Sequence, residues 1–357
     1  MKILFLVDRM SGGGAERFTS LLSDKMVRDG HEVLLMSDTY FQSVYPLNAS
    51  IKSYPLFHTP KESGSLLCLF YMLRHVRKVL KAEKPAVVIG VMPVMNLVAI
   101  IASIGLGIKT IVTHHTSFDR RVGIHIRLIQ NYVYRLASAV TILTQADEKL
   151  LGNRLSQKVV MPNPLSFPCI TSEIKDRKKN VLLVGRLDVW ELKGFDLMIK
   201  MWARIEQQFP DWTLDIAGSG RASSMQYLVD YAASLGVSSR VNFLGFCDEI
   251  DAVMRNSSIF ALTSRVEGFG MVLIEAMSQG CASIAFDCGG RQKEIIRSDE
   301  EGLIVENHDE DAFISKLCLL MEDEELRSKI SRNGIIRANS YHIDVIGKKW
   351  EELLSSL

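Results

Sequence analysis

Two glutamates flank a glycine-rich segment, Ser264-Arg-Val-Glu-Gly-Phe-Gly-Met-Val-Leu-Ile-Glu-Ala-Met-Ser-Gln-Gly280. The apolar run 259–263 before it predicts a buried strand, so the glycines form a turn that opens a helix. Glu267 precedes this turn, and Glu275 lies inside the helix. Backbone N–H groups at such a turn bind anions, and carboxylates accept hydrogen bonds from hydroxyls. The pattern predicts a phosphorylated sugar ligand. For an isolated pair of glutamates, a buried amphipathic helix that the glutamates only cap or solvate is the simpler alternative.

Two cations follow the first predicted strand of the second half, in Val184-Gly-Arg-Leu-Asp188 and Lys193-Gly-Phe-Asp196. Arg186 offers two-point hydrogen bonding to phosphate, and Lys193 offers a point charge. A solvated loop would also carry such residues. We expect no metal site, with neither a D-x-D motif nor a cluster of His and Cys ligands. These cations are therefore expected to stabilise a leaving diphosphate without a divalent metal.

The first half carries a second glycine-rich loop, Ser11-Gly-Gly-Gly-Ala-Glu-Arg17, between a predicted strand and a helix. Glycines let the backbone approach a phosphate or sugar at a helix N-terminus. A dinucleotide fingerprint starting at Gly12 would need glycine where Arg17 stands, although Asp38 is placed like a ribose-binding acid. A nicotinamide-dependent oxidoreductase therefore stays as an alternative, as does a non-catalytic protein that binds sugar nucleotides.

Strand-like runs alternate with helical segments along the whole chain, which predicts doubly wound α/β domains. We expect strands at 3–7, 33–36, 87–91, 110–113, 140–143, 181–184, 214–217, 241–244, 259–262, 283–286 and 303–305. The proline-rich segment Met161-Pro-Asn-Pro-Leu-Ser-Phe-Pro168 predicts a linker. We expect domains at 1–165 and 166–340, with a C-terminal helix at 341–357 that packs back toward the first domain. The carboxyl ends of both sheets are expected to face one central cleft.

The composition predicts a globular, two-domain protein: 357 residues with 47% hydrophobic content. The cysteines show no C-x-x-C spacing, and we expect no secretory signal, so a reduced cytoplasmic chain is predicted. The segment 87–108 is uncharged and long enough to cross a bilayer, but Pro93, Asn96 and three glycines interrupt it. We interpret it as a strand followed by a buried helix.

Positive charge concentrates in the first half, where residues 1–165 carry 20 Lys and Arg against 11 Asp and Glu. From Leu66 to Lys81, apolar residues recur at helical spacing on one face and cations on another. The cations are Arg74, Arg77, Lys78 and Lys81. For the helix alone, a solvated surface helix is the simpler interpretation, and the positive charge of the first half supports contact with an anionic membrane surface as the alternative. No nucleic-acid partner is expected.

The segment Glu-Gly-Phe-Gly-Met-Val-Leu-Ile-Glu-Ala-Met closely resembles the donor-site motif of the family 4 retaining glycosyltransferases of the GT-B fold. The Gly-Arg-Leu and Lys-Gly motifs and the N-terminal Gly-Gly-x-Glu-Arg are similar to this family too. The segments 214–220 and 241–246 resemble family loops that wrap the nucleotide base. One departure is Cys288-Gly-Gly-Arg-Gln-Lys-Glu294, where relatives often carry a proline before the acid.

The resemblance implies transfer of a hexose-type sugar from a nucleotide diphosphate sugar, UDP first, to a glycan or lipid-linked glycan hydroxyl with retention. It implies polysaccharide or lipopolysaccharide biosynthesis and a position at the inner membrane face. The implied catalytic residues are Glu267 and His115, with Arg186 and Lys193 on the diphosphate. His115 would orient the sugar and support charge at the reacting centre, while His114 replaces an acid common in relatives. The implied donor contacts are Gly13, Gly14, Phe269, Gly270, Met271, Val272 and Glu275, and the implied acceptor contacts are Glu16 and Arg17.

Overall fold

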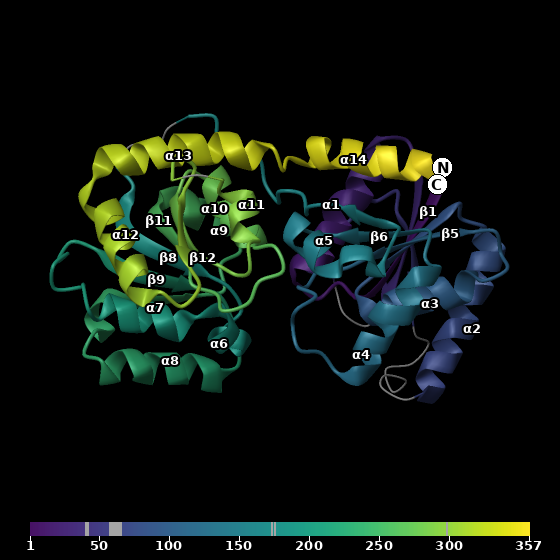
Figure 1. Cartoon of the computed structure of the whole chain (residues 1–357), viewed down its shortest axis with the longest axis horizontal. Helices are drawn as coiled ribbons and strands as arrows, with labels where there is room; N and C mark the ends of the chain where they lie inside the picture. The colour runs from purple at the N-terminus through teal and green to yellow at the C-terminus, as the bar shows by residue number, and fades with distance from the viewer. Residues whose placement is uncertain (40–42, 57–65, 173, 175, 298) are drawn as a thin grey trace. The chain divides into compact units, whose positions relative to one another are not determined.

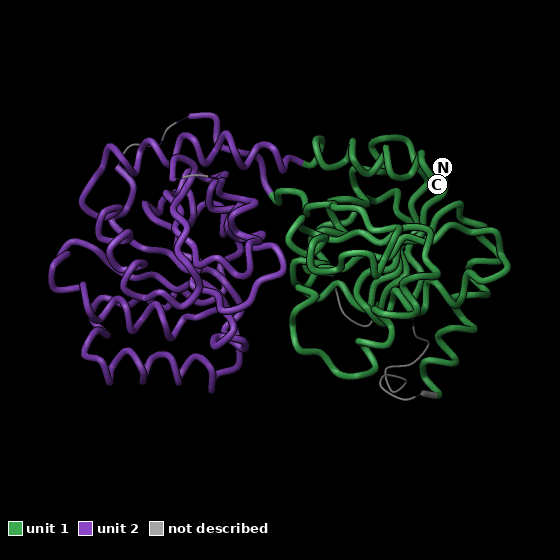
Figure 2. The backbone as a smooth tube through the Cα atoms, in the orientation of Figure 1, with its two compact units in different colours: residues 1–166, 343–357 green, residues 167–342 purple. Residues whose placement is uncertain are grey.

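The computed structural model describes residues 1–39, 43–56, 66–172, 174, 176–297 and 299–357. The chain divides into two compact units (Figure 2). The first comprises Met1–Ser166 and Ile343–Leu357, and the second comprises Phe167–His342. Each unit is built on one parallel β-sheet.

The sheet of the first unit has seven strands in the order β3-β2-β1-β4-β5-β6-β7. The order reverses at β1, as in a doubly wound fold, and ligands of such sheets bind beyond the carboxyl ends of the strands. Its strands are β1 (Lys2–Arg9), β2 (Glu32–Asp38), β3 (Lys52–Pro55), β4 (Val87–Val91), β5 (Lys109–Thr113), β6 (Ala139–Ile142) and β7 (Lys158–Val160). The central strands are buried on both faces, which explains why they read as continuous apolar runs.

Helices cover this sheet on its two faces. They are α1 (Gly14–Arg28), α2 (Leu66–Glu83), α3 (Pro93–Ser103), α4 (Ile124–Leu128), which continues as a π turn and a 3-10 turn to residue 136, α5 (Gln145–Leu151) and α14 (Ile343–Ser356). Figure 1 shows α2, α3 and α4 on the side away from α14. α3 contacts both α2 and the helical turns after α4.

The C-terminal helix α14 packs on α1 within the first unit. The buried Trp350 ring lies 5.7 Å from the Phe18 ring of α1. Glu351 Oε1 lies 2.8 Å from His31 Nε2. Burial of a large side chain such as Trp350 stabilises a fold by about 2–3 kcal/mol, so α14 is an integral part of the first unit.

The sheet of the second unit has six strands in the order β10-β9-β8-β11-β12-β13. They are β8 (Lys178–Val184), β9 (Thr213–Ala217), β10 (Val241–Gly245), β11 (Ser257–Leu262), β12 (Ala282–Asp287) and β13 (Leu303–Glu306). The helices are α6 (Trp190–Lys193), α7 (Phe195–Trp202), α8 (Ala222–Ser234), α9 (Ile250–Asn256), α10 (Met271–Ser278), α11 (Gln292–Ile295), α12 (Glu310–Glu322) and α13 (Glu324–Asn339). Two parallel doubly wound sheets confirm the predicted fold class.

The ambiguous segment 87–108 forms β4 and α3, as its composition predicted. Among the residues that the structure describes, no helix has the length and apolarity needed to span a bilayer.

Candidate active site

The glycine-rich motif lies at the carboxyl end of β11, the central strand of the second sheet beside β8. Glu267 follows this strand and is only 8% exposed. Gly270 adopts φ +95° immediately before α10, a conformation that a residue with a side chain rarely adopts. This glycine turns the chain into α10, so the first N–H groups of the helix lie next to the turn, as predicted.

Lys193 and Glu267 form an ion pair, with 2.6 Å between Nζ and Oε1. The Ser264 hydroxyl donates a second hydrogen bond to the same oxygen at 2.8 Å. Gly194, next to Lys193, has φ +66°, and a Cβ there would lie 1.9 Å from the Thr263 carbonyl oxygen. The backbone that carries the lysine is therefore pressed against the end of β11, which fixes the lysine beside the glutamate.

Arg186 lies in the loop after β8, and its side chain is 67% exposed. Its guanidinium is 3.8 Å from the Asp188 carboxylate. The Arg221 backbone N–H donates to Asp188 at 2.7 Å and is the main reason that the pKa of this aspartate is lowered. A Cβ on Gly218 would lie 1.8 Å from the Gly185 carbonyl oxygen, so the loops after β8 and β9 are in direct backbone contact.

The second glutamate of the motif, Glu275, lies in α10 and is 4% exposed. Met271 and Val272, at the start of this helix, are partly exposed. The Phe269 ring is buried and meets Tyr341 edge-on at 5.5 Å. Of the sequence-predicted donor contacts, Phe269 can therefore offer only its backbone to a ligand.

Sequence reasoning missed the residues that surround Glu267. Cys288 is buried, and its thiol donates to the Ser264 carbonyl oxygen at 3.0 Å. Burial, reinforced by Glu267, raises the pKa of this thiol to about 12, so it stays protonated at neutral pH. Gln292 donates to the Phe269 carbonyl oxygen at 3.2 Å. The only indication of these residues in the sequence was that the segment 288–294 departs from the family pattern. That departure did not show which side chains would contact the turn in place of the proline.

His114 and His115 follow β5 in the first unit, at the carboxyl edge of its sheet. His114 is 1% exposed and stacks on Phe118 with 3.8 Å between ring centroids. Burial lowers the pKa of each histidine to about 3. His115 also packs 4.5 Å from the Phe18 ring of α1.

The tautomer of His115 follows from its hydrogen bonds. Thr113 Oγ1 donates to the Gly90 carbonyl oxygen, so it accepts from His115 Nε2 at 3.0 Å. The nearby Asn163 side chain partly offsets the effect of burial on the pKa of His115. Among the described residues, neither His115 Nδ1 nor Asn163 Oδ1 has a hydrogen-bond partner with good geometry. A neutral His115 can accept a hydrogen bond at Nδ1 and carries no positive charge of its own.

The N-terminal glycine loop leads into α1, which begins at Gly14. The Gly13 N–H donates to the Tyr45 hydroxyl at 3.1 Å. A Cβ on Gly13 would lie 2.5 Å from Glu16 Oε2, so the Glu16 carboxylate lies against this glycine. Arg17 lies over the Tyr45 ring, 5.0 Å from its centroid, and donates to Ser166 at 3.3 Å. The two predicted acceptor residues, Glu16 and Arg17, therefore both contact other residues of the first unit.

The expectation that the sequence has no D-x-D motif is wrong, because the chain contains one, Asp309-Glu310-Asp311. Asp309 caps α12 through the Ala312 N–H, Glu310 pairs with Lys200, and Asp311 pairs with Arg204. Each carboxylate thus has a structural partner, and within the described ranges no three His, Cys, Asp or Glu side chains are grouped to hold a metal ion.

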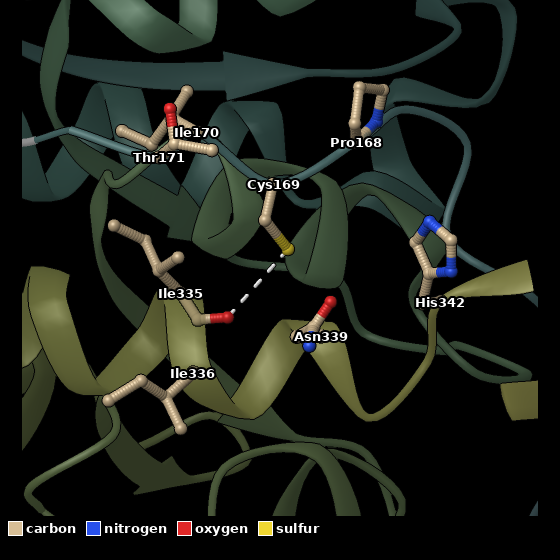
Figure 3. A pocket seen from close by; sticks show the side chains of 8 residues that line it. All are labelled: Pro168, Cys169, Ile170, Thr171, Ile335, Ile336, Asn339 and His342. Atoms are coloured by element: carbon tan, nitrogen blue, oxygen red, sulfur yellow. Dashed lines mark hydrogen bonds between the residues drawn. The ribbon is translucent and has the colours of Figure 1, made fainter. Parts of the chain in front are cut away.

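A cavity of about 420 Å³ lies elsewhere in the second unit, between the segment after Ser166 and the end of α13 (Figure 3). Its lining residues are Pro168, Cys169, Ile170, Thr171, Ile335, Ile336, Asn339 and His342. None of the sequence-predicted site residues lines it.

Two family models match the chain. Glycosyltransferase Family 4 matches residues 12–165, and Glycosyl transferases group 1 matches residues 171–337. The chain is 29% identical to the amylovoran biosynthesis glycosyltransferase AmsD of Erwinia amylovora over 99% of both chains. It is 27% identical to a Campylobacter jejuni alpha-1,4-N-acetyl-D-galactosaminyltransferase whose name includes a PP-undecaprenol-linked glycan, over 100% of this chain and 99% of that one.

The fold matches that of Anabaena HepE, solved in complex with UDP and glucose. The TM-score is 0.82 at 24% identity, and the match covers 100% of both chains. The matches to both halves set aside the oxidoreductase and non-catalytic alternatives. The chain therefore belongs to the family 4 glycosyltransferases, whose second half is the group 1 glycosyltransferase domain, and it has the GT-B fold.

Proposed function

We propose that this glycosyltransferase moves a hexose-type sugar from a UDP-sugar to a hydroxyl of a glycan or lipid-linked glycan, with retention at the anomeric carbon. The observation that carries the proposal is the contact between Lys193 and Glu267. A cation suited to phosphate and a carboxylate suited to sugar hydroxyls meet at one turn, as the junction between hexose and diphosphate requires. The UDP complexes among the similar structures support the choice of base.

Each residue has one proposed role. Glu267 accepts hydrogen bonds from hexose hydroxyls, and Glu275 accepts them from the ribose. Arg186 and Lys193 bind the diphosphate, whose negative charge grows as it leaves. Backbone N–H groups at Gly270, Met271 and Val272 face the donor. In the first unit, neutral His115 orients a sugar hydroxyl, the backbone of Gly13 and Gly14 meets the donor, and Glu16 and Arg17 meet the acceptor.

In the proposed reaction the bond from the anomeric carbon to the diphosphate oxygen breaks. The acceptor oxygen bonds to the same face of that carbon, and its proton passes to the leaving phosphate oxygen. No protein nucleophile is needed. Because Arg186 and Lys193 supply the positive charge, we propose that no divalent metal takes part. Activity should survive exhaustive EDTA treatment; loss with EDTA and rescue by Mg²⁺ or Mn²⁺ would contradict this part.

The donor and the stereochemistry are tested together. The full chain is screened by thermal shift against UDP-, GDP-, ADP- and dTDP-sugars, and the product anomer is then read by NMR with a lipid-linked glycan acceptor. We expect UDP-sugars to stabilise the chain most and the product to keep the donor's anomeric configuration. Stronger stabilisation by a sugar nucleotide with another base would overturn the proposed UDP-sugar donor. A product with the opposite anomeric configuration to the donor would overturn the proposed retention.

We propose peripheral docking on the inner membrane face for the lipid-linked acceptor, through the outer face of α2. The exposed Arg74, Lys78 and Lys81 follow the exposed aromatic rings of Phe70 and Tyr71 along this helix. Arg77 does not belong to this surface, because it donates to the Ala102 and Ile104 carbonyl oxygens at 2.8 Å and caps α3. Of the four cations predicted for this face, Arg77 therefore has a structural role, and the other three remain exposed.

The helical segment 124–136 adds a second candidate surface. Its outward residues Ile124, Leu128, Tyr132 and Leu136 recur every four residues and are 71%, 49%, 63% and 63% exposed. Exposed arginines at 120, 121, 127 and 135 flank this stripe. Both this segment and α2 pack against α3, so both stripes belong to one side of the first unit. Apolar residues with flanking cations suit an anionic bilayer surface.

A further inference from the structure

The loop that departs from the family pattern places a glutamine against the donor turn. Gln292, the first residue of α11, is 0% exposed. Its Oε1 accepts the Cys288 N–H at 2.7 Å, and its Nε2 donates to the Phe269 carbonyl oxygen at 3.2 Å. One side-chain amide therefore joins the loop after β12 to the turn before α10.

We infer that Gln292 is a positioning residue that fixes the orientation of the peptide between Phe269 and Gly270. In a planar trans peptide the C=O and the N–H point in opposite directions. Because Gln292 binds the Phe269 C=O, the Gly270 N–H points away from Gln292. This N–H is one of those assigned to the donor, so the inference rests on the proposed function.

The turn needs such a restraint because of its glycine. Gly270 has φ +95°, and glycine occupies positive and negative φ at similar cost. A peptide that precedes a glycine can therefore rotate by half a turn with little strain. The hydrogen bond from Gln292 favours one of these two orientations. A proline at this position would offer no side-chain amide.

The two loops are also joined without Gln292. The Cys288 thiol donates to the Ser264 carbonyl oxygen at 3.0 Å, which links the two loops. Arg291 donates to the Cys288 carbonyl oxygen at 2.9 Å, which braces the loop after β12 internally. The bond from Cys288 to Ser264 holds the loop after β12 close to the turn without Gln292. A change at Gln292 therefore alters the peptide orientation more than the position of the loop.

The test is the nearly isosteric Gln292→Glu variant of the full chain. An ionised glutamate can still accept the Cys288 N–H, but its other oxygen repels the Phe269 carbonyl oxygen. A protonated glutamic acid donates to that oxygen and restores the bond. Burial raises the pKa of a carboxyl group above its ordinary value, which brings this recovery toward the working pH range.

The control is Gln279→Glu, since Gln279 is also buried in the same unit, but its amide donates to Pro168 and accepts from Arg255 rather than contacting the donor turn. With a UDP-sugar and acceptor, Gln292→Glu should lose at least 10-fold in kcat at pH 8, and its activity relative to wild type should rise toward pH 6. Gln279→Glu should show neither effect, and both variants should unfold within a few degrees of each other.

Wild-type kinetics in Gln292→Glu, or the same loss in both variants, would overturn the inference. If Gln292→Glu does not fold, Gln292→Met keeps the volume and removes both hydrogen bonds. That variant should lose kcat at least 10-fold at every pH, and unchanged kinetics would overturn the inference as well. A wild-type chain that binds no UDP-sugar would overturn the proposed function and this inference with it, whereas an active wild type isolates the failure to Gln292.

Discussion

Lys193 Nζ lies 2.6 Å from Glu267 Oε1, so the cation proposed for the diphosphate and the carboxylate proposed for the hexose share one contact. Glu267 is 8% exposed, and the Lys193 side chain is 27% exposed. Removing the lysine charge would leave a buried carboxylate without its counter-ion, which costs far more than losing an exposed ion pair. Arg186 is exposed, so the two cations should behave differently when they are removed.

Lys193→Ala and Arg186→Ala should each lower kcat/KM by a factor that corresponds to about 2–4 kcal/mol, the effect of one lost preorganised charge contact. Only Lys193→Ala should also lower the free energy of unfolding, because it exposes the Glu267 charge to an apolar surrounding. Steady-state kinetics and urea unfolding measure the two effects. Arg204→Ala, which removes an exposed cation paired with Asp311, is the control. Near-normal turnover in both site variants would reject the diphosphate assignment.

Gly194→Ala should destabilise the second unit by about 3 kcal/mol or more. A left-handed φ costs a residue with a Cβ about 1–2 kcal/mol, and the added methyl would also lie 1.9 Å from the Thr263 carbonyl oxygen. Gly236→Ala is the matched control, because Gly236 has φ +75° with no heavy atom near the added Cβ. It should cost about 1–2 kcal/mol. Equal losses in urea unfolding would show that the contact between Gly194 and β11 is not tight.

His114 should make the first unit sensitive to acid. Burial lowers the pKa of His114 to about 3, whereas the unfolded value is about 6.5. Between these values the unfolded chain binds more protons than the folded chain, so stability falls as the pH drops through this window. His114→Phe should reduce the stability lost between pH 7 and pH 5 by about 2 kcal/mol. His125→Phe, at an exposed ring, should leave the loss unchanged, and the same slope in all three proteins would contradict the account.

The membrane surface predicts charge-dependent vesicle binding. Arg74→Glu with Lys78→Glu should weaken sedimentation with anionic vesicles at least 10-fold, because each cation near the surface contributes about 1 kcal/mol. Ile124→Ser with Leu128→Ser should weaken it through lost apolar contact, and added salt should weaken wild-type binding. Lys348→Glu with Lys349→Glu, on α14, changes the same charge elsewhere in the first unit and should have little effect. Equal binding to neutral and anionic vesicles would reject the proposal.

Most of the strands predicted from the sequence have two buried faces, although the partly buried edge strands β10 and β13 were predicted as well. The runs at 3–7 and 259–262 are apolar throughout because helices cover both faces of their sheets. β3 and β7 were missed, since they lie at the sheet edges and are short and only partly buried. β3 (Lys-Ser-Tyr-Pro) and β7 (Lys-Val-Val) carry no long apolar run, so their sequences resemble loops, whereas the edge strand β13 (Leu-Ile-Val-Glu) carries one.

The site was predictable where local sequence determines it and not where distant segments meet. The glutamates and glycines of the turn form one continuous motif. The contact of Lys193 with Glu267 joins positions 74 residues apart, and the bond from Gln292 to Phe269 depends on how the loops after β11 and β12 pack. The capping role of Arg77 was also hidden, because helical periodicity gives the face of a residue but not what its guanidinium reaches.

In the proposed complex, the turn after β11 binds the two ends of a UDP-sugar with two different glutamates, Glu267 and Glu275. Steady-state kinetics of Glu267→Gln and Glu275→Gln, with unfolding curves for both, tests it most directly. Glu267 would contact the sugar whose charge and geometry change, so Glu267→Gln should lower kcat by about 100-fold or more. Glu275 would hold the ribose, which does not change, so Glu275→Gln should raise the donor KM and leave kcat within a few-fold of wild type. Two folded variants with unchanged kinetics, or two variants that differ from wild type only in stability, would show that neither glutamate binds the donor.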